Sequence, residues 1–319
     1  MTRLRIVIPG GSGQVGRVLA RHFHRQGHAV TVLSRTPRPE QWNSVEWDGR
    51  TPGAWAGCLE GCDVLINLTG RSVNCRYGAA NRREILESRV ESTALLNPVV
   101  ASLAHPPKVW LNAGTATIYR HSLDREMDEE GELGGTEPGA PASWRFSIAV
   151  AKAWEAAFFG TATPQTRKVV LRSAMTFSHD RGGVFDAFLG LVRHGLGGTI
   201  GSGSQYVSWV HEADFLRGVE FLMARQEFAG VVNIASPNPL PNREFIRALR
   251  EAWGARVGVA SPRWAVEVGA ALLRTESELV LKSRRVVPGR LAAAGFSFLF
   301  PEWAPAAREL VGRWRKDRV

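Results

Sequence analysis

The glycine-rich segment at residues 10–16 constrains the fold of this chain more than any other feature. It follows an apolar run over residues 4–8 that is typical of a buried strand, and it opens a helical pattern over residues 14–26. Glycines at this spacing allow a tight turn, a close approach of the backbone to a pyrophosphate, and close packing of helix on strand. The helix N-terminus adds unpaired N–H groups and partial positive charge. In this strand–loop–helix context the segment predicts a dinucleotide site. The residues that we expect at the cofactor here are Gly10, Ser12, Gly13, Gln14, Val15 and Gly16.

The end of the second expected strand, residues 29–33, indicates which dinucleotide binds. An Asp or Glu about 20 residues after the loop would hold the ribose hydroxyl of NAD, whereas this chain has Ser34 and Arg35. A guanidinium pairs with the 2′-phosphate that a carboxylate would repel. We therefore expect NADP(H) rather than NAD(H), with Ser34 and Arg35 at the cofactor. The alternative is that Arg35 is simply one exposed arginine in an arginine-rich chain.

Short apolar runs alternate with helical patterns over the first two-thirds of the chain, which predicts βαβ units on a parallel sheet. After residue 173 glycine-rich loops interrupt this alternation, and from residue 237 helices broken by prolines follow. The fold class that we predict is α/β: a doubly wound parallel Rossmann sheet over residues 1–236, with a loop over 178–205 turned toward the substrate cleft, and a smaller helical cap over 237–319. Further strands are expected at 64–67, 109–112, 168–171, 206–210 and 231–234, and further helices at 82–103, 242–253, 262–273, 276–282 and 305–314.

The composition argues against several classes of partner. The net charge of +10 is spread along the 319 residues, whereas a nucleic-acid site needs a concentrated basic stripe. We expect no specific nucleic acid, and RNA binding stays open only because of the charge. No apolar stretch approaches the roughly 20 residues of a membrane span, the first residues leave no room for a signal peptide, and the three cysteines lack metal-ligand spacing. We expect a cytoplasmic monomer or homodimer with no metal, acting on a small molecule.

Three runs near the middle of the chain carry a narrower pattern: Gly-Leu-Gly-Gly at 195–198, Gly-Ser-Gly at 201–203 and Ser-Trp-Val-His at 208–211, followed by Asp214. Together with the glycine loop and the strand that ends at Arg35, they resemble the extended short-chain dehydrogenases/reductases. Within that family they resemble the atypical NAD(P)-dependent epimerase-like (YfcH-like) branch, which has a C-terminal helical domain of unknown function. The likeness runs from end to end of the chain.

The resemblance implies further contacts with the dinucleotide. It places a strand end, a helix face and two later positions along the cofactor. If the resemblance is set aside, the sequence predicts that the helix-face charges Glu84 and Arg89 are solvated. His211 and Asp214 resemble a family element that we interpret as helix capping and scaffold, because such residues satisfy free N–H groups near a helix start. The residues implied at the cofactor are Leu68, Thr69, Gly70, Glu84, Arg89, Ala113 and Thr176.

The chain departs from the resemblance in its catalytic residues. Short-chain dehydrogenases use a Tyr as general acid/base with a Lys four residues later, and none of the three tyrosines here, Tyr77, Tyr119 and Tyr206, has such a Lys. Alignment on Trp154 puts Ser147 at the Tyr position. A serine hydroxyl is too short and too weakly acidic to substitute directly, because proton transfer at neutral pH needs a group whose pKa lies near 7.

The remaining candidates for catalysis are Thr115, which keeps the expected hydroxyl, and Tyr119, with water as the other proton source. The function that we infer is an NADP(H)-binding, epimerase-like oxidoreductase that acts on a small polar carbonyl or sugar-nucleotide-like substrate without the usual Tyr-x-x-x-Lys pair. The alternative is a non-catalytic NADP(H)-binding sensor or regulatory protein.

Overall fold

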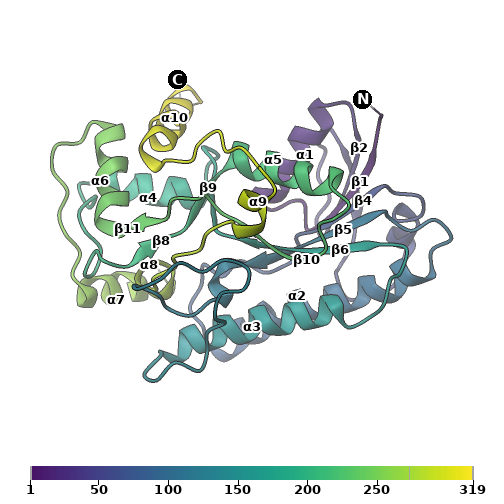
Figure 1. Cartoon of the computed structure of the whole chain (residues 1–319), viewed down its shortest axis with the longest axis horizontal. Coiled ribbons are helices and arrows are strands. Elements are labelled where there is room, and N and C mark those ends of the chain that lie inside the picture. Colours follow the sequence, from purple (N-terminus) through teal and green to yellow (C-terminus); the bar gives the residue numbers. More distant parts are fainter. Residues whose placement is uncertain (1, 273, 318–319) are drawn as a thin grey trace.

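A parallel sheet forms the centre of the molecule (Figure 1). The computed structural model describes residues 2–272 and 274–317. Within these ranges the main sheet has seven strands in the order β10-β6-β5-β4-β1-β2-β3. The chain winds outward from β1 in one direction and then restarts on its other side at β4, so the switch point lies between β1 and β4. The strands are β1 (Arg5–Pro9), β2 (Ala29–Ser34), β3 (Asn43–Glu46), β4 (Val64–Asn67), β5 (Val109–Thr115), β6 (Arg167–Ser173) and β10 (Gly230–Ile234).

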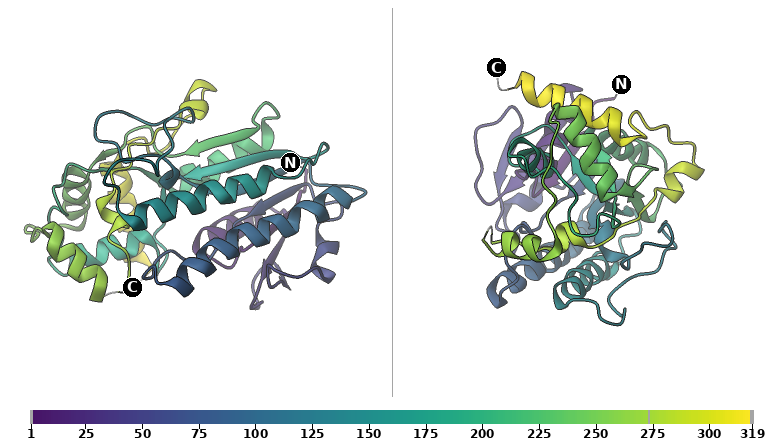
Figure 2. Two further views of the ribbon diagram at one scale, coloured as in Figure 1. Left: turned by 90° about the horizontal axis from the view of Figure 1, so that it is seen from below. Right: turned by 90° about the vertical axis from the view of Figure 1, so that its left-hand side faces the viewer.

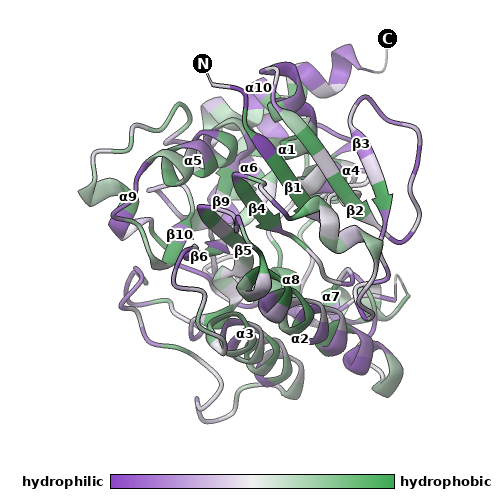
Figure 3. Cartoon of the chain, turned by 90° about the vertical axis from the view of Figure 1, so that its right-hand side faces the viewer, coloured by the Kyte–Doolittle hydropathy of each residue, from purple (hydrophilic) through white to green (hydrophobic). Residues whose placement is uncertain are grey.

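Helices cover both faces of the sheet because successive strand residues point to opposite sides. Ile6 and Ile8 face the core that contains α1 (Gln14–Arg25) and α5 (Glu212–Ala224), whereas Val7 faces the core that contains α2 (Ala79–Ser102) and α3 (Ala142–Phe159). The long helices α2 and α3 run beside each other along one face (Figure 2). Figure 3 shows the largely hydrophobic strands of the sheet with helices of mixed hydropathy around them. The sheet and its two helical layers confirm the doubly wound fold that the sequence predicts.

A second core lies beyond the carboxyl ends of the strands. It joins α4 (Val184–Arg193), α6 (Asn242–Trp253) and α10 (Trp303–Lys316) around a cluster of aromatic side chains that includes Phe177, Phe245 and Trp303. The other elements are two small sheets, β7 (Met175–Phe177) with β9 (Trp209–His211) and β8 (Tyr206–Val207) with β11 (Leu240–Pro241). There are also short helices α7 (Arg263–Leu272), α8 (Glu278–Leu281) and α9 (Gly289–Ala293), and 3-10 turns η1 (Ala54–Cys58) and η2 (Ala116–Ile118).

Two parts of the structure differ from the expectations. The expected loop over 178–205 contains α4, whose apolar residues have helical spacing but are flanked by glycines that dominate the sequence pattern. Strand β3 was not expected; it is an edge strand with one apolar residue, Val45, so it shows no clear alternation. The end of the helix expected over 262–273 reaches Leu273, which lies outside the described residues.

Residues from both sides of the boundary expected at 236/237 pack in each of the two cores. Leu291 and Phe296, from the C-terminal part, pack in the core of the main sheet, and Phe177 and Trp209 belong to the second core. In the described ranges, no helix combines the length and apolar character that a membrane span requires.

Candidate functional site

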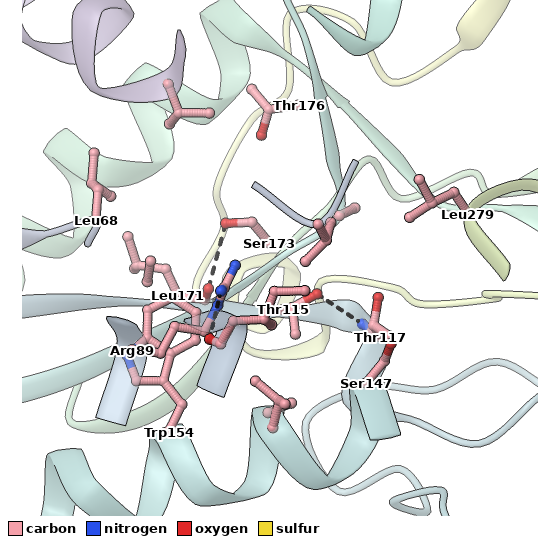
Figure 4. Close-up of a pocket in the computed structure, with 18 of the residues that line it drawn as sticks. Leu68, Arg89, Thr115, Thr117, Ser147, Trp154, Leu171, Ser173, Thr176 and Leu279 are labelled. Atoms are coloured by element: carbon pink, nitrogen blue, oxygen red, sulfur yellow. Dashed lines mark hydrogen bonds between the residues drawn. The ribbon is translucent and has the colours of Figure 1, made fainter. Parts of the chain in front are cut away.

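A cavity of about 340 Å³ lies where the carboxyl ends of β4, β5 and β6 meet the second core. Its volume is in the range of small-molecule sites, and its walls are mainly apolar, as such sites usually are. Figure 4 shows Leu68, Arg89 and Trp154 toward one side of it and Thr115, Ser147 and Leu279 toward the other. The cavity brings together seven of the residues that the sequence predicted: Gln14, Val15, Leu68, Arg89, Ala113, Thr115 and Thr176.

The glycine loop borders this cavity, and its three spaced glycines meet different surroundings. Gly10 has φ +73°, and a Cβ there would lie 2.8 Å from the backbone of Leu68 and Thr69. A Cβ at Gly16 would lie 2.5 Å from the backbone of Gly11, so this position holds helix α1 against the loop. A Cβ at Gly13 would meet only the Gly10 carbonyl oxygen at 3.6 Å. Open space therefore remains at Gly13, at the N-terminus of α1.

Two buried polar atoms beside the loop have no hydrogen-bond partner within the described part of the chain: Gln14 Nε2 and Thr69 Oγ1. Buried polar groups are normally paired, so each unpaired one calls for a partner. The first turn of α1 also carries no acidic residue that would repel an anion. Unpaired polar groups, free helix N–H groups and open space at Gly13 together fit a phosphate-bearing, hydrogen-bonding ligand such as a dinucleotide.

Ser34 and Arg35 end the second strand beside the loop. The Ser34 hydroxyl donates a hydrogen bond to Ser12 Oγ at 3.0 Å and accepts one from the Thr36 N–H at 3.3 Å. Arg35 is exposed, and across the described ranges no carboxylate forms an ion pair with it. Its guanidinium is therefore available to an anionic ligand.

Arg89 brings a partly buried positive charge to the cavity wall. Its Nη1 donates to the Ile85 carbonyl at 2.9 Å, and its guanidinium lies over the Trp154 ring at 5.2 Å. Burial lowers the pKa of Arg89 to about 10, so it remains charged at neutral pH. A Cβ at Gly70 would lie 3.0 Å from Arg89 Cζ, so a larger residue at this position would crowd the guanidinium.

Ten of the predicted residues do not line the cavity, among them Glu84 and Tyr119. Glu84, which was expected to face the dinucleotide, is exposed, forms an ion pair with Arg71 and does not line the cavity. Tyr119 is buried next to β6 and β10, where its hydroxyl donates to Asn233 Oδ1 at 2.8 Å and accepts from Arg172 Nη1 at 2.9 Å. The guanidinium of Arg172 anchors it there. The lining of the cavity does not include Tyr119, which was expected to supply a proton in the cleft.

Thr115 does line the cavity, and its Oγ1 accepts a hydrogen bond from the Thr117 N–H at 3.1 Å. Its hydroxyl hydrogen is left for another acceptor, which a substrate oxygen could provide. Ser147, the residue aligned with the usual Tyr, also lines the cavity from helix α3. Lys152 is exposed on the same helix and donates to the Gly134 carbonyl at 2.7 Å, away from the cavity.

Three functional candidates were missed by the sequence reasoning: Tyr77, Glu278 and Arg284. Ser147 Oγ donates to Glu278 Oε2 at 2.6 Å and lies 3.4 Å from the Tyr77 hydroxyl, while Arg284 Nη2 lies 3.8 Å from Glu278 Oε1. Burial raises the pKa of Glu278, and the nearby Arg284 opposes that rise. The available signal was a carboxylate directly before the apolar run of residues 279–281, which suggests burial but does not identify its neighbours.

The paired residues His211 and Asp214 have the scaffold role expected of them. His211 Nδ1 accepts from the Ala213 N–H at 3.1 Å at the start of α5. Asp214 accepts from the N–H groups of Leu299 and Phe300 at 2.7 and 2.8 Å, so it fixes a loop before α10 rather than its own helix. Neither residue lines the cavity.

Comparison with known proteins bears on this geometry. Residues 6–235 match the model of the NAD dependent epimerase/dehydratase family, and residues 261–310 match a domain of unknown function, DUF1731. The epimerase family protein SDR39U1 of Bos taurus is 33% identical over 312 residues, covering 97% of this chain and 100% of the relative.

Solved structures agree with the sequence matches. The crystal structure of human epimerase family protein SDR39U1 (isoform 2) with NADPH superposes with a TM-score of 0.84 at 30% identity, over 97% of this chain and 99% of that one. The UDP-N-acetylglucosamine 4-epimerase from Bacillus cereus superposes with a TM-score of 0.74 at 16% identity, over 98% of this chain and 99% of that one, and shares the fold.

Proposed function

Because this chain belongs to the NAD dependent epimerase/dehydratase family, we propose that it binds NADP(H) and acts as an epimerase-like oxidoreductase on a small polar carbonyl or sugar-nucleotide-like substrate. One observation carries the proposal: a single cavity is lined both by residues of the glycine loop and by the hydroxyls of Thr115 and Ser147. The NADPH in the structure of the human relative supports the choice of cofactor.

The residues of the loop would hold the phosphates. The N–H groups at the start of α1, open at Gly13, would bind the pyrophosphate. The exposed guanidinium of Arg35 would pair with the 2′-phosphate, next to the linked hydroxyls of Ser12 and Ser34. When bound, the cofactor would supply a hydride to the substrate or accept one from it.

The other side of the cavity would position the substrate. The free hydroxyl hydrogen of Thr115 can be donated to a carbonyl oxygen, and Leu279 and Phe146 are among the apolar side chains of the wall. A substrate that fills the cavity would displace water from these walls, which strengthens each hydrogen bond inside the site. The positive charge of Arg89 favours a substrate or cofactor group that carries a negative charge.

A second candidate function is a non-catalytic NADP(H) sensor. It is favoured by the residues of the cavity wall, where the described part of the chain supplies one tyrosine, Tyr77, and no lysine. The usual Tyr–Lys mechanism of proton transfer therefore has no counterpart here.

Two measurements separate these functions. NADPH and NADH are titrated against the protein by fluorescence, and carbonyl compounds and sugar nucleotides are then screened with NADPH. We expect turnover that Thr115→Ala reduces and that Tyr119→Phe, a change outside the cavity, leaves in place. Tight NADPH binding without turnover of any compound supports the sensor, and equal affinity for both cofactors contradicts the proposed NADP(H) preference.

A further inference from the structure

Glu278 is a buried carboxyl group that the usual mechanism of the family does not explain. It is the first residue of α8, its side chain is 1% exposed, and it lines the cavity. Its Oε2 accepts the Ser147 hydroxyl at 2.6 Å, whereas its Oε1 has no hydrogen-bond partner within the described ranges. A carboxylate held out of water with one oxygen unpaired is costly unless the group takes up a proton.

Groups from three segments face this carboxyl. Arg284 and Lys282 follow α8 in the chain, Glu276 precedes it, and Tyr77 approaches from the segment before α2. Arg284 is the one that forms an ion pair, at 3.8 Å from Oε1, which is too long for a hydrogen bond. Burial outweighs the attraction to Arg284 and Lys282, so the pKa of Glu278 is raised. A raised pKa brings the carboxyl closer to the range in which it can donate a proton near neutral pH.

The other hydroxyl groups of the cavity are poorer acids. Burial raises the pKa of Tyr77 above the usual value of a phenol, so Tyr77 holds its proton more tightly. The hydroxyls of Thr115 and Ser147 do not ionise in the physiological range. Glu278 is therefore the acid best suited to the task among these four side chains of the wall.

We propose that Glu278 is the proton donor for carbonyl reduction in this cavity, and that Ser147 passes the proton from the Glu278 carboxyl to the substrate oxygen. The proposal rests on the proposed NADP(H)-dependent function. Ser147 stands at the helix position where the resemblance places a tyrosine, and the 2.6 Å contact joins its short hydroxyl to an acid. The pair together supplies the reach and the acidity that a serine alone lacks.

The proposed step balances as follows. The carbonyl carbon accepts a hydride from the reduced nicotinamide, and the electron pair of the C=O π bond moves to the oxygen. When Glu278 is protonated, its carboxyl O–H donates to Ser147 Oγ across the 2.6 Å contact, and the Ser147 hydroxyl hydrogen turns to the substrate oxygen. That oxygen takes the hydroxyl proton of Ser147, and Ser147 takes the proton of the Glu278 carboxyl. The products are the alcohol, the oxidised cofactor and the Glu278 carboxylate, which is protonated again from solvent. Oxidation of an alcohol follows the same path in reverse.

Three variants and one matched control test this proposal. Glu278→Gln keeps the size of the side chain but cannot donate an acidic proton, Glu278→Asp keeps the acid, and Ser147→Ala breaks the path. Glu276→Gln makes the same change two residues away, outside the cavity lining, and keeps the oxygen that accepts the Tyr77 N–H. Because the charge of Glu276 helps to raise the pKa of Glu278, this control should retain the proton donor and titrate it at a lower pH. All four should bind NADPH as the wild type does, as measured by fluorescence.

Infrared spectroscopy gives a readout that is independent of turnover. The wild type and Glu276→Gln should show the C=O band of a protonated carboxyl group that disappears as pH rises, and Glu278→Gln should lack that band. With a carbonyl compound that the NADPH screen finds, Glu278→Gln and Ser147→Ala should lower kcat by about 100-fold or more, with little effect on KM. The rate of reduction should fall as pH rises through the pKa of Glu278, this dependence should be lost in Glu278→Gln, and Glu278→Asp should restore part of the rate.

The outcomes distinguish the two proposals. If the wild type does not bind NADPH, the proposed function fails, whatever Glu278 does. Three other results, each with NADPH bound, would show that the proposed role of Glu278 is wrong while cofactor binding stands. The first is that no titrating carboxyl band depends on Glu278, and the second is that no carbonyl compound is reduced. The third is that Glu278→Gln retains the rate and pH profile of the wild type. If Glu278→Gln does not fold, two other measurements test the role of Glu278. A wild-type kcat in Ser147→Ala, or the absence of a titrating carboxyl band in the wild type, would contradict it.

Discussion

At the scale of single residues, Gly13 and Gly16 differ in what their missing side chains leave free. Gly13 has φ −70°, which any residue can adopt, and open space around its α-carbon, whereas Gly16 is in tight contact with the backbone of Gly11. The first position therefore serves the ligand, and the second serves the packing of α1 on the loop.

We predict that Gly13→Val abolishes NADPH binding and leaves the protein folded, because the new side chain fills the space where the pyrophosphate approaches the helix. Gly16→Val, the control, should lower the melting temperature, since its Cβ would lie 2.5 Å from backbone atoms. Fluorescence titration and circular dichroism measure the two effects. A folded Gly13→Val protein with wild-type affinity would show that the loop is only structural.

A second residue-scale prediction concerns Arg35. Arg35→Ala should weaken NADPH by about 1.5 to 3 kcal/mol, the contribution of a hydrogen bond to a charged group, and should affect NADH much less. Arg25→Ala is the matched control, because Arg25 is also exposed but lies at the C-terminal end of α1, away from the glycine loop. Equal losses of binding free energy for NADPH and NADH would mean that Arg35 does not contact the 2′-phosphate.

The tyrosines show which part of the site could be predicted from sequence. The absence of a Tyr-x-x-x-Lys pair is a property of the sequence, and it predicts that the usual mechanism does not operate. Which tyrosine reaches the cavity depends on tertiary contacts: Arg172 and Asn233 hold Tyr119 in the core, while Tyr77 lies opposite Ser147. Both sets of contacts join residues at least 53 positions apart, so no local pattern contains them.

At the scale of elements, the segment around α8 brings charged side chains into an apolar region. Lys282, just after this helix, is 2% exposed, and its Nζ donates to the Thr117 carbonyl at 2.8 Å. Burial, followed by repulsion from Arg284, lowers the pKa of Lys282 from 10.5 to about 7. In the folded protein this lysine therefore loses its proton at a lower pH than in the unfolded chain.

This difference predicts how stability depends on pH. Between about pH 7 and 10.5 the unfolded chain binds more protons at Lys282 than the folded protein does, so the contribution of Lys282 to the free energy of unfolding rises with pH across this window. Lys282→Met should remove that rise, while Lys108→Met, at a lysine whose side chain is 85% exposed, should keep it. Urea unfolding at several pH values measures the effect. Parallel curves for wild type and Lys282→Met would contradict the prediction.

Local signals determined which elements the sequence could predict. Helix α6 begins and ends where expected, at Asn242 and Trp253, because an amphipathic pattern is closed by Gly254 at φ +86°. Helix α4 has the same kind of pattern between two groups of glycines, and those glycines suggested a loop. Its burial depends on contacts with α6 and the aromatic cluster, which the local sequence does not contain.

At the scale of the whole molecule, the net charge of +10 should affect association with any polyanion. We predict that RNA and DNA bind weakly and are released between about 50 and 200 mM salt, as counterion release requires. Fluorescence anisotropy with a labelled single-stranded RNA and a labelled duplex DNA tests this. A tight, sequence-selective complex that persists in high salt would establish a nucleic-acid partner that the cavity does not suggest.

The interleaving of the two cores has a consequence for modularity. Since Leu291 and Phe296 complete the core of the main sheet, while Phe177 and Trp209 complete the other core, neither half of the chain contains all the apolar contacts of either one. A fragment that ends at residue 236 would expose the surface that Leu291 and Phe296 cover, so we do not expect it to fold as an independent unit. The part of the chain beyond residue 236 therefore cannot be exchanged as a cassette between relatives, and the two halves are constrained to change together.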